Sequence, residues 1–274
     1  MSQEPSHEPE LDAAGAAAAL RWWRLAGVEF AVDEIPHNRF EPPAAIAPHE
    51  ERVRVPPHSA PAPAAPWIAT SVVGSDAEAA ASELAAACAD LETLRLNMEK
   101  FEGCALKRTA TQLVFADGVP GSRVMFVGEA PGADEDRIGR PFVGRAGQLL
   151  DRMLRAIGLD RKTVYIANVV PWRPPGNRTP TPQETAACLP FIRRQIELAA
   201  PKILVCMGAS SAQTLLGMKE GITRARGKWF AYRFDDGREL RALAMFHPAY
   251  LLRQPSQKRA AWTDLRALAK ELGS

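Results

Sequence analysis

The sequence predicts an α/β fold: a three-layer α/β/α domain with a central, mainly parallel four-stranded sheet, preceded by N-terminal helices. Three observations predict this class. From about residue 101, short apolar runs alternate with segments of helical periodicity. The runs are apolar throughout, as in parallel strands that helices cover on both faces. Polar turns follow several of the runs directly, at the carboxyl ends where such sheets place their sites.

Four apolar runs are the predicted strands, at residues 123–128, 163–170, 202–208 and 241–247. Helices are predicted between them, including an apolar stripe at 147–157 and a capping box with proline at the first helical position at 181–184. A last helix at 256–272 completes the domain, which covers residues 101–274. Residues 76–100 are predicted as one helix that leads into it.

Two zones precede these elements. Residues 1–40 are predicted as a tail with a short docking helix, because the adjacent Trp22 and Trp23 are unsuited to water. Residues 41–75 are a Pro/Ala-rich linker with eight prolines, a composition that does not build a packed core.

Charge is distributed unevenly along the chain. Residues 1–100 hold 7 Lys or Arg against 16 Asp or Glu, a net charge of −9, whereas residues 101–274 hold 27 against 16, a net charge of +11. A basic globular half favours a polyanionic partner, most simply nucleic acid. The alternative is a basic surface that serves only solubility.

The sequence carries no signal for export or membrane insertion. No charged-then-apolar region opens it, and no apolar run approaches the roughly 18 residues that span a bilayer. Its four cysteines are too few and too scattered for a secreted disulfide framework. We therefore expect a cytoplasmic protein.

Three segments rich in glycine and polar residues follow three of the predicted strands. They are Gly128-Glu129-Ala130-Pro131-Gly132-Ala133-Asp134-Glu135-Asp136 with Arg140-Pro141-Phe142-Val143-Gly144, then residues 168–178, then Phe246-His247-Pro248-Ala249-Tyr250-Leu251-Leu252-Arg253. Because carboxyl ends of parallel strands meet at one edge of a sheet, the three segments predict a single site there.

In these segments the chain resembles family 4 of the uracil-DNA glycosylase superfamily, over residues 101–272. The resemblance implies a monofunctional DNA glycosylase that hydrolyses the N-glycosidic bond of uracil in DNA, leaves an abasic site and starts base-excision repair. The implied partner is DNA that contains uracil or another deaminated base. We expect a monomer, whose N-terminal helix docks on its own domain or on a repair partner.

The resemblance also implies roles in base recognition. Phe142 is the aromatic on which a flipped base stacks, the alternative being a core plug. Asn168 reads the uracil edge with its amide, the alternative being a structural turn. Gly128 and Ala130 line the same pocket. His247 donates a hydrogen bond to uracil O2, where charge develops, unless it is a satisfied loop residue.

Water activation and DNA contact are assigned less directly. Family 1 enzymes have an aspartate where this chain has Ala130, as is usual in family 4. The residue that positions the attacking water is then one of three, Glu135 first, followed by Glu129 and Asn177. A loop-bracing role is an equal alternative for Glu129. Asp134 and Asp136 are expected to be solvated, with at most a capping role.

The end of the third segment is predicted to enter or line the minor groove of DNA. The residues concerned are Tyr250, Leu251, Leu252 and Arg253, with Leu251 or Leu252 as a wedge and Arg253 on a phosphate.

Family 4 enzymes usually carry a [4Fe–4S] cluster on four cysteines, and this chain departs from that pattern. Only Cys104 and Cys188 match the ligand positions, while Phe101 and Trp172 replace the other two. Large aromatic side chains fill the volume of a cluster, and a cluster with two ligands lost is not expected. We therefore predict no cofactor and no metal. Recruitment of Cys88 and Cys206 is the alternative.

Two other functions remain open. One is a glycosylase of the same fold that acts mainly on other deaminated bases, such as hypoxanthine or xanthine. The other is a DNA-damage binding module that has lost catalysis, which the intact Phe142, Asn168 and His247 disfavour.

Overall fold

The computed structural model describes residues 72–273, with side chains from Asp76 onward. These residues belong to one of two units into which the chain divides, Ala65–Ser274. The predicted tail, the docking helix and nearly all of the predicted linker lie outside the described residues.

A six-stranded sheet forms the centre of the described part, with the strand order β1-β3-β2-β4-β6-β5. Its four inner strands run parallel and correspond to the four predicted strands, which are thereby confirmed. They are β3 (Tyr165–Asn168), β2 (Val124–Gly128), β4 (Ile203–Met207) and β6 (Glu239–Met245).

Two antiparallel edge strands were not predicted. The strand β1 (Asp117–Gly118) pairs with β3, and β5 (Trp229–Arg233) pairs with β6. The two residues of β1 are too few to show a pattern. The turn between β5 and β6 contains Asp236-Gly237, with Gly237 at a φ of 86°, and this dipeptide is a recognised hairpin signal.

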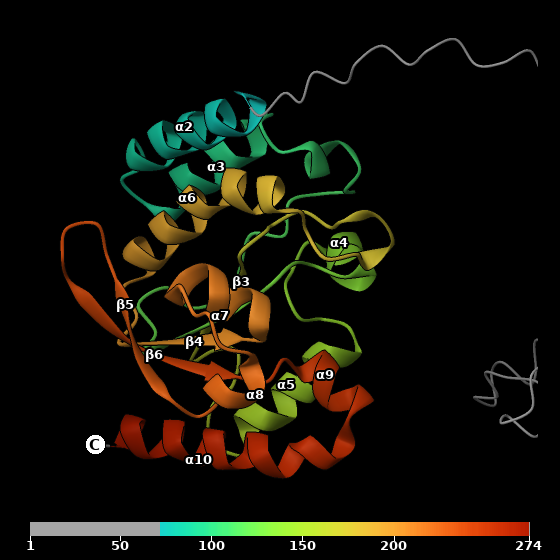
Figure 1. Ribbon diagram of the computed structural model, residues 1–274, viewed down its shortest axis with the longest axis vertical. Helices are drawn as coiled ribbons and strands as arrows, with labels where there is room; N and C mark the ends of the chain where they lie inside the picture. Colours follow the sequence, from blue (N-terminus) through green and yellow to red (C-terminus); the bar gives the residue numbers. More distant parts are fainter. Residues whose placement is uncertain (1–71, 274) are drawn as a thin grey trace, which may run out of the picture. The chain divides into compact units, whose positions relative to one another are not determined.

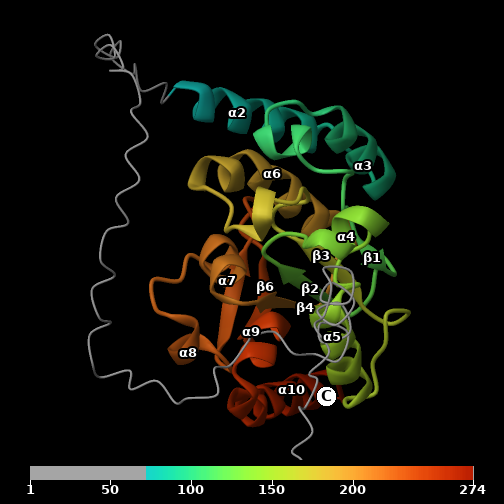
Figure 2. The same ribbon diagram turned by 90° about the vertical axis from the view of Figure 1, so that its right-hand side faces the viewer.

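Helices cover both faces of the sheet, which confirms the three-layer prediction (Figures 1 and 2). The helices after β1 are α4 (Ala133–Ile138), α5 (Arg145–Arg155), α6 (Pro182–Ala199), α7 (Ala209–Leu216), α8 (Ile222–Ala225), α9 (Pro248–Arg253) and α10 (Lys258–Gly273). Alternate residues of β2 enter different cores: Met125 and Val127 pack on the side of α6 and α7, and Val124 and Phe126 on the side of α5, α9 and α10.

The segment predicted as one helix at 76–100 is two helices, α2 (Val72–Ala86) and α3 (Leu91–Lys100). Asp90 ends the continuity because its carboxylate accepts a hydrogen bond from the Thr93 amide at 2.7 Å and caps α3. The guanidinium of Arg194 on α6 donates to the Cys88 carbonyl at 2.7 Å and holds the bend. The prediction missed a capping signal inside the helical pattern.

The predicted capping box of α6 is present. The Glu184 amide donates to the Thr181 hydroxyl at 3.2 Å, and the Thr181 amide donates to the Glu184 carboxylate at 2.7 Å. None of the helices between Val72 and Gly273 has the length and apolar character needed to cross a membrane.

Candidate active site

A cavity of about 860 Å³ lies at the carboxyl ends of the four parallel strands. All three predicted segments contribute to its lining. The predicted site residues that line it are Glu129, Ala130, Glu135, Phe142, Asn168, Asn177, His247, Tyr250 and Arg253. The lining does not include Gly128, Leu251 or Leu252.

Gly128 nevertheless shapes the pocket from its place at the end of β2, where it pairs in register with Asn168 of β3. A Cβ atom on Gly128 would lie 2.5 Å from Asn168 Oδ1 and 2.6 Å from Phe142 Cζ. Both side chains therefore occupy the space that a glycine leaves open.

The Asn168 side chain is buried, with 4% of the residue exposed, and lines the pocket. Its Oδ1 atom accepts no hydrogen bond from the described residues. A buried amide oxygen without a partner is costly, and such atoms usually meet a donor. Its place in the pocket wall is consistent with a donor on a ligand.

The rings of Phe142 and His247 lie side by side, with centroids 5.3 Å apart and planes inclined by 35°. His247 caps α9, and its Nδ1 accepts a hydrogen bond from the Ala249 amide at 3.1 Å. An accepting Nδ1 places the proton of a neutral imidazole on Nε2. Burial, with a smaller effect of the Arg253 charge, lowers the pKa of His247 to about 4. The ring is therefore neutral at pH 7 and offers one N–H donor.

The two glutamates of the first segment differ in their surroundings. Glu135 accepts hydrogen bonds from the amides of Val143 and Gly144, both at 2.8 Å, through Oε1, and from the Gly132 amide at 3.1 Å through Oε2. Its carboxylate thus braces residues 141–144, hereafter the Phe142 loop. Both of its oxygens are occupied, although the residue lines the pocket.

Glu129 has a free carboxylate oxygen instead. Its Oε1 is buried without a partner among the described residues. Burial raises the pKa of the Glu129 carboxyl, and hydrogen bonding with Ser210 and Thr179 opposes part of that rise. A raised pKa at a pocket wall is typical of a group that takes up a proton during a reaction.

Two predicted residues, Asn177 and Asp136, have surroundings that the sequence did not indicate. Asn177 is exposed at the pocket rim, and its Oδ1 accepts from Arg173 Nε at 2.7 Å. Asp136 is not solvated: it is buried and accepts from the amide and the hydroxyl of Thr111, both at 2.8 Å. It ties α4 to the chain that precedes β1, so the expectation of a solvated Asp136 was wrong.

The third segment divides between core and surface. Leu251 is 1% exposed and packs in the core below α9, so its assignment as a wedge is wrong. Leu252 is half-buried, and Arg253 is exposed beside the pocket. The Tyr250 ring lies 4.9 Å from that of Phe246. The helical period turns neighbouring leucines to different sides, which the prediction did not resolve.

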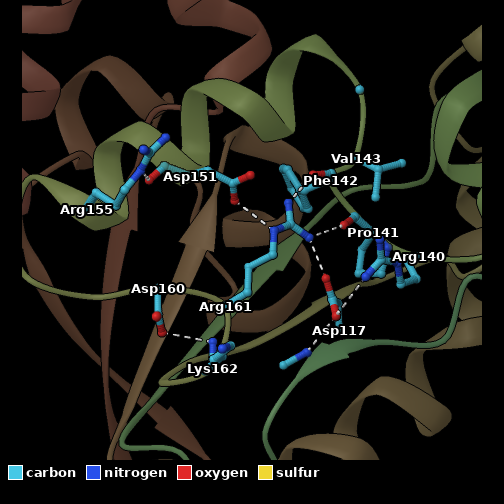
Figure 3. A network of polar contacts seen from close by, with 12 residues as sticks. Asp117, Arg140, Pro141, Phe142, Val143, Asp151, Arg155, Asp160, Arg161 and Lys162 are labelled. Carbon is cyan, nitrogen blue, oxygen red and sulfur yellow. Dashed lines mark hydrogen bonds and ion pairs between the residues drawn. The ribbon is translucent and has the colours of Figure 1, made fainter.

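Two further parts of the site were not predicted from the sequence. The fourth parallel strand, β4, ends at the pocket too, and Ser210 at the start of α7 lines it beside Glu129. Gly208, which follows β4 with a φ of 94°, was an available signal. The second contributor is Arg161, which contacts the backbone of the Phe142 loop (Figure 3). An arginine in a polar turn has no distinctive sequence pattern.

A separate region contains the two remaining family cysteines. Cys104 Sγ and Cys188 Sγ lie 3.7 Å apart, and both residues are buried. The Phe101 ring packs edge-on against Phe191 at 5.0 Å, and Trp172 is 2% exposed. Among residues 76–273, no group of three or more His, Cys, Asp or Glu is arranged to hold a metal ion.

Comparison with known proteins places this geometry in a family. The model of the uracil DNA glycosylase superfamily matches residues 115–266. The type-4 uracil-DNA glycosylase of Thermotoga maritima is 42% identical over 172 residues, which are 61% of this chain and 86% of the relative. The type-4 uracil-DNA glycosylase of Archaeoglobus fulgidus is 39% identical over 175 residues, covering 62% of this chain and 87% of the relative. That of Sulfurisphaera tokodaii is 38% identical over 183 residues, or 65% and 83%.

These relatives contradict the prediction that the protein has no cofactor. They are type-4 enzymes, and that family usually carries a [4Fe–4S] cluster, so the prediction is withdrawn. The four-cysteine ligand set of the family does not fit the described residues, which supply the Cys104 and Cys188 thiols at 3.7 Å together with two aromatic side chains.

The family model covers more than half of the chain, and the relatives are matched over most of their length. The pocket lies where the three family motifs meet, at the ends of the parallel strands. The chain belongs to the uracil-DNA glycosylase superfamily, in its type-4 branch.

Proposed function

We propose that this pocket excises uracil from DNA by hydrolysing the N-glycosidic bond of deoxyuridine, which leaves an abasic site and starts base-excision repair. Membership of the type-4 branch makes the chain a uracil-DNA glycosylase. The single observation that carries the assignment is the buried, unpaired Asn168 Oδ1 in the pocket wall, beside Phe142.

The Asn168 amide matches the edge of uracil. Its Oδ1 accepts from uracil N3–H, and its Nδ2 donates to O4. Cytosine presents an acceptor at N3 and a donor at N4, so both contacts would oppose like groups. A flipped uracil is extrahelical, and the Phe142 ring provides a face on which it stacks.

His247 stabilises the leaving group. Cleavage sends the electron pair of the N1–C1′ bond into uracil, and negative charge develops on O2. Because Nδ1 accepts from the Ala249 amide, the proton of the neutral imidazole is on Nε2, and His247 lines the pocket, where this N–H is the donor for O2. With its pKa lowered to about 4, His247 acts as a hydrogen-bond donor and does not need to be cationic.

Glu129 positions the attacking water. The water oxygen bonds to C1′ of the oxocarbenium-like sugar, and the proton passes to the Glu129 carboxylate. Burial, which raises its pKa, favours this uptake. Both oxygens of Glu135 already accept backbone amides and support the loop, whereas Glu129 Oε1 has no partner, so Glu129 takes the first place among the three candidates.

DNA is held at the rim. Arg253 is exposed beside the pocket and meets a phosphate, and Leu252 takes the wedge role between bases. We also propose that the protein acts as a monomer. Light scattering during size-exclusion chromatography tests this, and an activity that requires a dimer would contradict it.

Single-turnover excision with excess protein on an oligonucleotide containing one uracil tests the function. We expect full excision by the natural chain and about 100-fold slower excision by Asn168→Ala, with DNA binding retained. The same assay with hypoxanthine and xanthine separates the alternatives. Faster excision of either base than of uracil, or binding without excision of any base, would contradict the proposal.

A further inference from the structure

We propose that Arg161 is a positioning residue of this site, which holds the Phe142 loop by its carbonyls and thereby sets the ring on which the base stacks. The inference rests on the proposed function and adds to it a residue outside the three motifs. Arg161 lies in the turn before β3 and is absent from the pocket lining.

The guanidinium reaches two consecutive carbonyls of the loop (Figure 3). Arg161 Nη1 donates to the Pro141 carbonyl at 3.1 Å, and Nη2 donates to the Phe142 carbonyl. The loop is therefore held from two directions, because Glu135 binds the amides of Val143 and Gly144 while Arg161 binds the carbonyls that precede them.

The loop needs such restraint because Phe142 is strained. Its φ is 56°, in the left-handed region that bulky residues rarely adopt. Conformations of this kind persist only where the surroundings impose them, and they concentrate at functional sites. Gly147 of α5 allows the close approach, since a Cβ there would lie 1.6 Å from the Phe142 carbonyl oxygen.

Arg161 is itself fixed by two carboxylates from separate elements. Its Nε donates to Asp151 of α5 at 2.7 Å, and its Nη1 donates to Asp117 of β1 at 2.5 Å. Its side chain is 23% exposed, so the ion pairs are partly shielded from water. The planar fork thus joins two carboxylates and two carbonyls, an arrangement that the compact ammonium of lysine does not reproduce.

The experiment compares Arg161→Gln and Arg161→Lys with the same changes at Arg194 in the full chain. Arg194 is a matched control, because it also binds a backbone carbonyl, that of Cys88, and a carboxylate, that of Glu197, but lies on α6 away from the pocket. We expect Arg161→Gln to slow single-turnover excision of uracil about tenfold, within the range expected for loss of base–aromatic stacking. Arg161→Lys should recover little, and both Arg194 variants should excise at the natural rate.

A double-mutant cycle with Phe142→Ala separates positioning from a general structural effect. If Arg161 acts through the Phe142 ring, adding Arg161→Gln to Phe142→Ala slows excision less than twofold further. Full additivity of the two losses, or an equal loss in the Arg194 variants, would overturn the inference. If Arg161→Gln does not fold, as judged by thermal unfolding, Asp151→Asn takes its place in the cycle, since it removes the charge of one anchoring carboxylate and leaves Arg161 itself in the chain.

The natural chain serves as the reference for the proposed function. Absence of uracil excision by the natural chain would contradict the function itself. Normal excision by the natural chain together with undiminished rates in the Arg161 variants would contradict only the role of Arg161.

Discussion

The pocket wall, which includes Asn168, Glu129 and His247, differs from the Phe142 loop in how its polar groups are hydrogen-bonded. In the wall, Asn168 Oδ1 and Glu129 Oε1 are buried without partners. In the loop, the carbonyls of Pro141 and Phe142 and the amides of Val143 and Gly144 are all hydrogen-bonded. The groups that we propose to meet the substrate are thus unpaired, and the backbone groups around the Phe142 ring are hydrogen-bonded. The same difference separates Glu129, whose Oε1 has no partner among the described residues, from Glu135, whose two oxygens accept backbone amides.

The largest expected effect is at His247. His247→Ala removes the only donor that we assign to uracil O2 and should slow excision by about 10²–10³-fold, the usual loss for one donor at a developing oxyanion. DNA affinity, measured by fluorescence anisotropy on an abasic-site analogue, should change little. Excision by this variant at the natural rate would contradict the assignment of His247 as the donor to uracil O2.

The next effect compares the two glutamates directly. Glu129→Gln keeps the shape of the side chain but takes up no proton, so excision should slow by about 100-fold while the melting temperature stays near that of the natural chain. A Glu129 variant that melts early and excises normally would mean that this residue braces the loop.

Glu135→Gln should show the reverse pattern. The substitution places an NH₂ group against backbone amides, which should lower stability by about 1–2 kcal/mol with only a modest loss of excision rate. Calorimetry measures the first quantity and single-turnover assays the second. Loss of activity without loss of stability would return Glu135 to the role of water-positioning residue.

A smaller effect is expected from pH. The pKa of His247 is depressed to about 4 in the folded protein from an ordinary 6.5, so the unfolded state binds more protons between these values. This residue should therefore lower stability as pH falls from about 6.5 toward 4, and His247→Asn should flatten that part of the stability curve.

The rate of excision should depend on pH through Glu129. Because burial raises the pKa of the Glu129 carboxyl, the single-turnover rate should decline on the acid side as Glu129, and not His247, takes up its proton.

The smallest effect on excision is expected at Leu252, which is half-buried, in contrast to the buried Leu251 of the same helix. Leu252→Ala should slow uracil excision a few-fold in duplex DNA and leave stability near the natural value. Leu251→Ala should instead cost about 2–5 kcal/mol of stability, since its side chain is buried in the core. Thermal unfolding and excision on duplex against single-stranded substrate measure the two outcomes.

The main features of the fold and the position of the site were predictable because they depend on local pattern. Continuous apolar runs marked the four parallel strands, and the glycine and polar residues after three of them marked the pocket edge. The capping signal at Asp90 and the Asp236-Gly237 turn are local patterns too, although the predictions did not include the break between α2 and α3 or the strand β5.

The amino-acid sequence was sufficient to predict the family, the four parallel strands and the motifs that line the pocket, because continuous apolar runs and motif spacing are properties of the chain. The folded structure was needed to show that Glu129 has an unpartnered oxygen while Glu135 accepts backbone amides, that Asp136 is buried, and that Leu251 lies in the core. It also brought Arg161 to the Phe142 loop across three elements. Burial and hydrogen-bond saturation depend on contacts between distant segments, and the order of residues in the chain does not record them.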